Sequence, residues 1–394
     1  MTPLHITATT IVSALGSGEA ATLAALRAGR TALTPADFED TPRHGFIGRV
    51  AGLDTWQLPG ERQAFQCRNN AIADMALRNA EFRDEVEAAA RRYGSHRIAT
   101  VIGTSTSAIL SAENAYRARD TATGALPAAF SYDHSYDLYS VTRFVRQELG
   151  LRGPATTVST ACASSARAFI DAHALIAAGM ADAAIVGGAD SLCRLTLHGF
   201  ASLDLISPGA TRPCDAARDG ISIGEAAGFM LLERAPSARG GVALLGFGAS
   251  SDGYHISSPS PDGAGAALAM RQALARAGLH AEDIDYINLH GTGTRANDAA
   301  EDAAVATVFG RDTLCSSTKG ATGHTMGSCG ILEAAIAKLA ILNGFMPGCI
   351  GMANVDPGFG MAVLAENVAR PLRHVLSNSF GFGGINCSLV FGAA

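Results

Sequence analysis

The residue best suited to act as a nucleophile is Cys162, in the segment T-T-V-S-T-A-C-A-S-S. A β-branched run precedes it and an Ala-rich run follows it, which predicts a strand and then a helix that begins at the cysteine. Free N–H groups and the partial positive charge of a helix N-terminus stabilise a thiolate and lower its pKa. The alternative is a buried structural cysteine, which the local sequence by itself favours.

Two histidines lie in Gly-rich segments where they could meet such a thiol. His290 follows the apolar run 286–289, and His324 shares the segment K-G-A-T-G-H with Lys319. Active and ligand-binding sites of α/β proteins usually lie at the ends of the strands. A neutral imidazole at such a place can donate a hydrogen bond to a carbonyl oxygen. Glu333 lies in an apolar helical stretch and needs a partner, for which Lys319 is the candidate. Each residue taken singly also has a structural explanation.

A third Gly-rich segment, S-N-S-F-G-F-G-G-I-N, lies near the C-terminus and alternates glycines with Phe380 and Phe382. A turn of this kind can aim backbone N–H groups at a developing oxyanion. A purely structural turn is the alternative.

The elements that must position these residues alternate between short apolar strands and Ala-rich helices, which predicts a layered α/β fold. We predict strands over 5–11, 98–102, 156–160, 183–186, 242–247, 286–289, 314–318, 375–380 and 388–391, and helices over 19–28, 69–89, 161–179, 266–277 and 331–342. The segments 156–179 and 314–344 resemble each other, because each runs from a strand through a small-residue loop into a buried helix. We therefore predict that the chain consists of two similar halves, with a boundary near Gly240.

Composition excludes several classes of protein. The 394 residues are 48% hydrophobic and carry a net charge of −6, so no nucleic-acid or anionic-membrane surface is indicated globally. The eight cysteines show no C-x-x-C pair and no spacing typical of zinc sites, and we predict no disulfide framework. No signal peptide and no apolar run of membrane-spanning length is apparent, so we expect a cytoplasmic protein without a membrane span.

In order and content, the motifs resemble those of the elongating β-ketoacyl-acyl-carrier-protein synthases, which belong to the thiolase-like superfamily. The resemblance covers nearly the whole chain and rests on T-A-C-A-S-S, R-P-C-D-A-A-R-D-G-I-S-I-G-E-A-A-G, H-G-T-G-T, K-G-A-T-G-H and N-S-F-G-F-G-G-I-N. It implies two similar α/β halves in a five-layer αβαβα arrangement. Residues 1–240 would carry the nucleophile, and residues 241–394 the two histidines and the Gly-rich oxyanion loop.

The resemblance also implies a role for each reactive residue. Cys162 would take an acyl group from a carrier-protein thioester, and His290 and His324 would hydrogen-bond the malonyl thioester carbonyl and promote decarboxylation. Backbone N–H groups of Cys162 and Phe380 would form the oxyanion hole. Phe380 would also be the gating aromatic, in the same loop as Phe382.

Further polar residues would hold the site in place. The resemblance implies that Lys319, paired with Glu333, orders the catalytic site. Residues 297–301 would form a structural turn, in which Glu301 joins a buried polar network.

Substrate contacts are implied at three threonines. Thr292 and Thr294 match threonines that contact the pantetheine arm, and Thr106 belongs to a segment expected to shape the acyl pocket. Because residues 104–135 do not resemble those of a housekeeping fatty-acid enzyme, we expect an unusual acyl chain, such as an aryl-polyene-like product.

The resemblance implies no metal and no cofactor beyond the phosphopantetheine of the acyl-carrier protein. The expected partners are that carrier protein and a second subunit, in a homodimer or in a heterodimer with a chain-length-factor-like subunit. Two other functions stay open: a non-catalytic chain-length-factor-like subunit, and another thiolase-like acyltransferase. The presence of Cys162 with both histidines argues against the former, and K-G-A-T-G-H argues against an initiating synthase.

Overall fold

The computed structural model describes residues 1–41, 45–234 and 241–394, so the predicted boundary at Gly240 lies outside the described residues. Within them, one mixed sheet contains the strands in the order β14-β12-β11-β16-β17-β10-β1-β9-β7-β5-β6, with β2 paired to β1. The strands of this sheet are β1 (Leu4–Ser13), β2 (Gly16–Ser17), β5 (Ile98–Gly103), β6 (Ala155–Val158), β7 (Ala183–Asp190), β9 (Ala226–Glu233), β10 (Val242–Ser251), β11 (Tyr286–Asn288), β12 (Leu314–Ser316), β14 (Ala362–Val363), β16 (His374–Gly381) and β17 (Ile385–Ala393).

The α-helices are α1 (Glu19–Arg27), α2 (Arg68–Leu77), α3 (Ala80–Tyr93), α4 (Ile109–Arg117), α5 (Ser140–Glu148), α6 (Ser164–Ala177), α7 (Arg194–Ser202), α8 (Ala264–Ala277), α9 (Arg295–Phe309), α10 (Lys319–Thr322) and α11 (Cys329–Asn343). Short strands β3 (Thr34–Pro35), β4 (Phe46–Gly48) and β8 (Ile223–Gly224) form a small second sheet, and β13 (Phe345–Met346) pairs with β15 (Val368–Ala369).

The two halves of the large sheet repeat one pattern of strand pairing. In the first half β1 and β9 are antiparallel, β9 and β7 are antiparallel, and β7, β5 and β6 are parallel. In the second half β10, β17, β16, β11 and β12 follow the same order with the same senses. The halves join where β1 pairs antiparallel with β10, along Leu4 to Ile6 and Val242 to Leu244.

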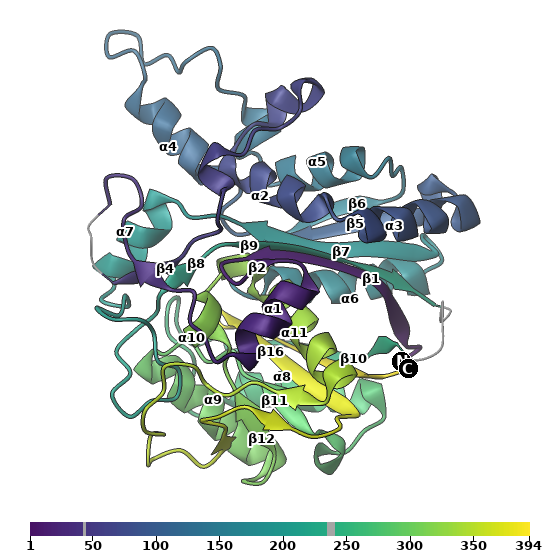
Figure 1. Cartoon of the computed structure of the whole chain (residues 1–394), viewed down its shortest axis with the longest axis vertical. Helices are drawn as coiled ribbons and strands as arrows, with labels where there is room; N and C mark the ends of the chain where they lie inside the picture. The colour runs from purple at the N-terminus through teal and green to yellow at the C-terminus, as the bar shows by residue number, and fades with distance from the viewer. Residues whose placement is uncertain (42–44, 235–240) are drawn as a thin grey trace.

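Helices divide the molecule into five layers, as the family resemblance implies (Figure 1). Helices α2, α3 and α5 pack on the outer face of the first half, and α8 and α9 pack on the outer face of the second half. Between the halves lie α6 and α11, whose apolar side chains share one core with residues of both halves. Because apolar faces of both half-sheets must be covered, this pair lies between them, and α11 is buried along most of its length.

The structure corrects the predicted helix 69–89 and the predicted turn 297–301. The predicted helix 69–89 is two helices, α2 and α3, separated at Asn79, whose side chain accepts a hydrogen bond from Phe82 N–H and caps α3. The predicted turn 297–301 lies inside helix α9, which begins after Thr294 as its N-cap. Both corrections concern where a helix starts, which depends on capping contacts that a sequence pattern shows poorly.

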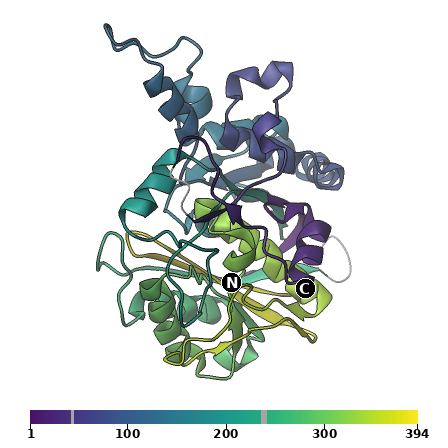
Figure 2. The same cartoon turned by 60° about the vertical axis from the view of Figure 1, so that its left-hand side comes forward.

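One segment projects from the layered body. It includes α4 and extends away from the sheet in Figure 2. It carries the exposed aromatic side chains of Tyr116, Tyr132 and Tyr136.

A buried helical segment corrects the expectation that no apolar run is long enough to cross a membrane. By length and composition, Met326–Asn343 is long and apolar enough, and 83% of this window is buried inside the fold.

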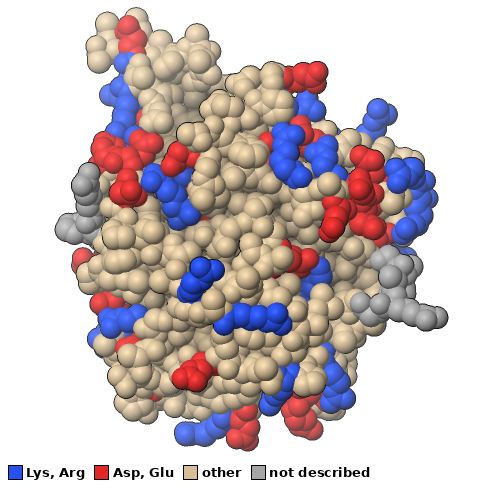
Figure 3. Space-filling model, viewed as in Figure 1, with Lys and Arg blue, Asp and Glu red and all other residues tan. Residues whose placement is uncertain are grey.

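On the face shown in Figure 3, Lys and Arg side chains are interspersed with Asp and Glu.

Helices α6 and α11 approach closely because Gly330 has no side chain. A Cβ at Gly330 would lie 2.6 Å from the Ala166 backbone nitrogen and 2.8 Å from Ala166 Cβ. Since both contacts are below van der Waals distance and one is to backbone, the helices would have to separate to admit even a methyl group.

We therefore predict that Gly330→Ala destabilises the protein by about 1–3 kcal/mol through overpacking. Gly199→Ala is the matched control: Gly199 lies within α7, and no heavy atom lies within 4 Å of its Cβ position. Urea denaturation of both variants measures the effect. Equal stability of the two variants would contradict the packing explanation.

Candidate active site

A strained turn between β6 and α6 presents Cys162. Ala161, just before it, has a φ of +49°, a left-handed conformation that is costly for a residue other than glycine. Ser164 stabilises the turn, because its hydroxyl accepts from Thr160 N–H at 2.9 Å and donates to the Ala161 carbonyl at 2.6 Å. The helix begins at Ser164, two residues beyond the cysteine and later than predicted.

The environment of Cys162 contradicts the expected lowered pKa. The thiol is buried, and burial raises its pKa from 9.0 to about 12, although the Lys319 charge and the Phe382 N–H oppose this rise. The helix N-terminus therefore does not produce a resting thiolate. Proton transfer from Cys162 needs a base within reach.

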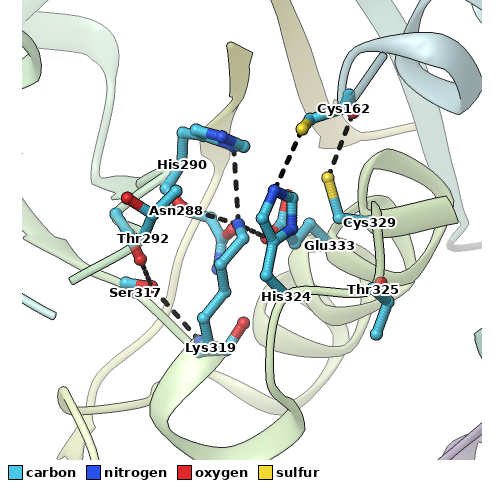
Figure 4. A network of polar contacts seen from close by, with 12 residues as sticks. Cys162, Asn288, His290, Thr292, Ser317, Lys319, His324, Thr325, Cys329 and Glu333 are labelled. Carbon is cyan, nitrogen blue, oxygen red and sulfur yellow. Dashed lines mark hydrogen bonds and ion pairs between the residues drawn. The ribbon is translucent and has the colours of Figure 1, made fainter. Parts of the chain in front are cut away.

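His324 lies within reach of that proton (Figure 4). Its Nε2 atom is 3.0 Å from Cys162 Sγ, and its ring meets the His290 ring edge-on with centroids 5.2 Å apart. Burial lowers the pKa of both imidazoles well below 6.5, and the nearby Lys319 charge lowers them further. The sequence-predicted trio of Cys162, His290 and His324 thus meets as a thiol and two neutral imidazoles.

Lys319 and Glu333 form the predicted buried ion pair. The Lys319 ammonium also donates to the His290 carbonyl oxygen at 2.6 Å and lies 3.5 Å from His290 Nδ1. Burial lowers the pKa of Lys319, but the ion pair with Glu333, together with Cys329 and Glu301, outweighs burial and leaves that pKa raised. Because an ammonium has only donors, it favours the tautomer in which the His290 proton is on Nε2.

Two buried carboxylates hold the H-G-T-G-T loop. Glu301 accepts from the N–H groups of His290 and Gly291 at 2.8 and 2.7 Å, which confirms its predicted place in a buried polar network. Asp298 accepts from Thr292 N–H at 3.0 Å. Both acids come from α9, so the helix that replaces the predicted turn is the element that sets this loop.

The oxyanion donors differ from the expectation. The backbone N–H groups of Cys162 and Phe382 are the ones that oppose the rise in the Cys162 pKa. Phe380 instead lies within β16, in register with Asn386, and its ring is 6.0 Å from that of His290. Phe382 is thus the loop residue whose N–H faces the sulfur, because the β16–β17 turn begins only after Phe380.

A narrow pocket of about 90 Å³ leads to these groups. Thr292 and Thr294 line it, as expected for contacts with an extended substrate arm. Thr106 does not: its hydroxyl and N–H both bind the buried carboxylate of Asp190, at 2.7 and 2.8 Å. Thr106 therefore supports the fold behind the nucleophile and is not available to a substrate in this pocket.

Three residues of the site carried no usable signal in the sequence. Phe200 lines the pocket and packs against the Phe382 ring at 5.4 Å, but it lies on α7, a helix that the sequence pattern did not predict. Cys329 contacts the Cys162 carbonyl oxygen through its thiol at 3.2 Å. Asp190 accepts further hydrogen bonds from Thr104 and Ser105.

The trio also has the composition of a metal site, since the Cys162, His290 and His324 ligand atoms lie within 4.8 Å of one another. Thiolate and imidazole are ligands that Zn²⁺ prefers. The Lys319 ammonium beside His290 opposes a cation there, however, so the charge distribution fits an uncharged or anionic guest better than a metal ion.

Comparison with known proteins places these features in context. Residues 1–238 match the model described as beta-ketoacyl synthase, N-terminal domain, and residues 242–353 match its C-terminal domain. The chain is 37% identical, over 98% of its length and 97% of the relative, to 3-oxoacyl-[acyl-carrier-protein] synthase 2 of Rhizobium meliloti (strain 1021). A ketosynthase of Xenorhabdus doucetiae, solved in complex with its chain length factor, superposes with a TM-score of 0.89 at 36% identity, covering 100% of this chain and 98% of that one. The ishigamide ketosynthase/chain length factor superposes with a TM-score of 0.89 at 30% identity, covering 99% of each chain.

The lowered pKa values of His290 and His324 predict how stability depends on pH. Below pH 6.5 the unfolded chain binds protons that the folded site excludes. The free energy of unfolding therefore decreases as the pH is lowered, by up to ~1.4 kcal/mol per pH unit for each histidine. Urea denaturation across this range measures the slope, and His290→Gln should make it shallower. Imidazole NMR titrations with midpoints at or above 6.5 in the folded protein would contradict the prediction.

Proposed function

Because the chain belongs to the beta-ketoacyl synthase family and is a condensing acyltransferase, we propose that it holds the acyl group on Cys162 and extends it with a malonyl thioester. The observation that carries this proposal is the convergence of one thiol, two neutral imidazoles and two backbone N–H groups at the end of one narrow pocket.

In the first half-reaction, Cys162 Sγ attacks the carbonyl carbon of a carrier-bound acyl thioester. Its proton passes to His324 Nε2, 3.0 Å away, and then to the departing pantetheine sulfur. The N–H groups of Cys162 and Phe382 stabilise the oxyanion that forms. An acyl-Cys162 thioester and a free carrier thiol result.

In the second half-reaction, His290 and His324 donate hydrogen bonds to the thioester carbonyl of a malonyl group. His324, whose Nε2 accepted and released the thiol proton in the first half-reaction, donates as its other neutral tautomer, in which the proton is on Nε2. Loss of CO₂ leaves its bonding electron pair on the α-carbon as an enolate, which the two donors stabilise. The carbon attacks the acyl-Cys162 carbonyl, and the tetrahedral intermediate expels the Cys162 thiolate, which takes up one proton. Neutral imidazoles suit this step because a donor is needed and a strong base is not.

A non-catalytic chain-length-factor-like role is the alternative from another class. Such a subunit would have no use for a thiol placed 3.0 Å from an imidazole in a pocket, so the retained site favours the catalytic role. Another thiolase-like acyltransferase is a second alternative. The ion pair of Lys319, which orients His290 for hydrogen-bond donation, favours the decarboxylative reaction over it.

We further propose a specialised pathway with an unusual, aryl-polyene-like acyl chain. Two full-length structural relatives are ketosynthases named with chain length factors, which supports this assignment. The curated relatives named 3-oxoacyl-[acyl-carrier-protein] synthase 2 support primary fatty-acid synthesis as the alternative. Identification of the longest product formed from a malonyl-carrier extender distinguishes the two.

The proposed reaction needs acyl-carrier protein as partner and no metal or cofactor other than the carrier's phosphopantetheine. We place it in the cytoplasm, since all eight cysteines are free, as suits a reducing compartment. A chain-length-factor-like protein or a second copy is the proposed subunit partner. The β6 edge strand, which pairs on one side with β5 and is only partly buried, offers a place for pairing.

We predict that the purified chain forms a dimer of twice its 40.4 kDa mass, because an open edge strand and exposed aromatic side chains favour association. Light scattering after size-exclusion chromatography measures the mass. A monomer that becomes a dimer only with a chain-length-factor-like protein would favour the heterodimer, and a monomer under both conditions would contradict the prediction.

We also predict that Cys162 is the acylated residue. Intact-mass spectrometry after incubation with an acyl-carrier protein should show one added acyl group, which Cys162→Ala abolishes. Cys329→Ala is the matched control, because Cys329 is an equally buried thiol that contacts the Cys162 carbonyl. Acylation that survives Cys162→Ala would overturn the assignment of the nucleophile.

A further inference from the structure

Cys329 is a second buried thiol beside the nucleophile, and neither half-reaction uses it. It is the first residue of α11, and its side chain is buried. Its Sγ atom lies 3.2 Å from the carbonyl oxygen of Cys162, a contact drawn as a dashed line in Figure 4. Cys329 therefore links the backbone of the nucleophile to a helix other than the one that follows it.

The protonation state of Cys329 makes it the donor in this contact. Burial raises the pKa of Cys329 well above 9.0, and the Glu333 carboxylate raises it further, although the Lys319 charge and the Ser379 hydroxyl oppose this rise. The side chain is therefore a thiol, and a thiol is a weak hydrogen-bond donor. The hydrogen bond runs from the Cys329 S–H to the Cys162 carbonyl oxygen.

The backbone at Cys162 needs support of this kind. Helix α6 begins only at Ser164, so Cys162 lies in the turn before the helix, next to the left-handed Ala161. A strained backbone keeps its conformation only where the surrounding structure fixes it. On the N–H side of Cys162 the chain approaches closely, because a Cβ at Gly381 would lie 3.1 Å from the Cys162 nitrogen. On the carbonyl side the Cys329 thiol supplies the contact.

We propose that Cys329 is a positioning residue for acyl transfer: its S–H holds the Cys162 peptide so that Cys162 Sγ stays 3.0 Å from His324 Nε2. Cys329 does not line the pocket, so it acts through Cys162 and not on a substrate. This inference rests on the proposed function and deepens it, because it assigns a further residue to the first half-reaction.

The alternative is that Cys329 acts through Glu333. The two residues are four positions apart in α11, and one ligand atom from each lies within 4.8 Å of the other and of a ring nitrogen of His290. In that case Cys329 would support the Lys319–Glu333 ion pair and, through it, the decarboxylation step. A thiol has a single proton, however, and the contact with the Cys162 carbonyl assigns that proton to the nucleophile's backbone.

The test separates the two half-reactions. Single-turnover acylation of Cys162 is measured against the concentration of an acyl-carrier donor, and decarboxylation is measured with malonyl-carrier protein alone. We expect Cys329→Ala to lower the acylation rate constant at saturating donor by about fivefold, the scale of one lost hydrogen bond. The half-saturating donor concentration and the rate of decarboxylation should stay unchanged. Acylation should still reach one acyl group per chain at the end point, only more slowly.

Two further variants separate positioning from a loss of folded protein. Cys329→Ser keeps a donor at the same place, so its acylation rate constant should stay within about twofold of the unaltered enzyme. Cys315→Ala is the matched control, because Cys315 is a buried thiol whose Sγ lies 3.4 Å from a different carbonyl oxygen, that of Ala362. It loses the same kind of contact and should acylate at the normal rate. Unfolding would lower the amplitude of the acylation and leave its rate constant unchanged.

Three results would overturn the proposal. They are an unchanged acylation rate constant in Cys329→Ala, an equal fall in Cys329→Ser, and a fall in decarboxylation as large as the fall in acylation. Failure of the unaltered enzyme to become acylated at all would instead contradict the proposed function.

Discussion

The site depends on the burial of one positive charge. The Lys319 side chain is only 1% exposed, and its ammonium contacts the Glu333 carboxylate and the backbone carbonyl and ring of His290. A buried ammonium is costly unless it is fully paired, so these contacts constrain helix α11, the H-G-T-G-T loop and the K-G-A-T-G-H loop to a single relative arrangement. Burial lowers the pKa of both imidazoles, and the same charge lowers it further, so both are neutral.

A neutral resting site follows from this constraint. Cys162 is a thiol and both histidines are uncharged, so the site stores no reactive thiolate before a substrate arrives. Negative charge develops only as the thioester reacts. In the proposed reaction, the N–H groups of Cys162 and Phe382 and the imidazole donors are already in place at that stage. The sequence alone suggested that a helix N-terminus stabilises negative charge at Cys162. In the buried site, preorganised hydrogen-bond donors have that role instead.

The five-layer architecture supplies the burial. Cys162 comes from the turn before α6 and His324 from the loop that leads to α11, and these two helices share the central layer. Close approach of the helices at Gly330 brings Cys162 Sγ and His324 Nε2 to 3.0 Å from each other, although 162 positions separate the two residues in the chain.

The sequence by itself determined the layered α/β class, the trio of Cys162, His290 and His324, and the partnership of Lys319 with Glu333, because motif order and the need to pair buried charge are local or pairwise properties. Only the tertiary structure decided that Cys162 has a raised pKa, that the N–H of Phe382 and not that of Phe380 acts on its thiol, that Thr106 binds Asp190, and that 297–301 is helical. Desolvation, the start of a turn and the partner of a hydroxyl depend on residues distant in the chain. No local pattern can report them.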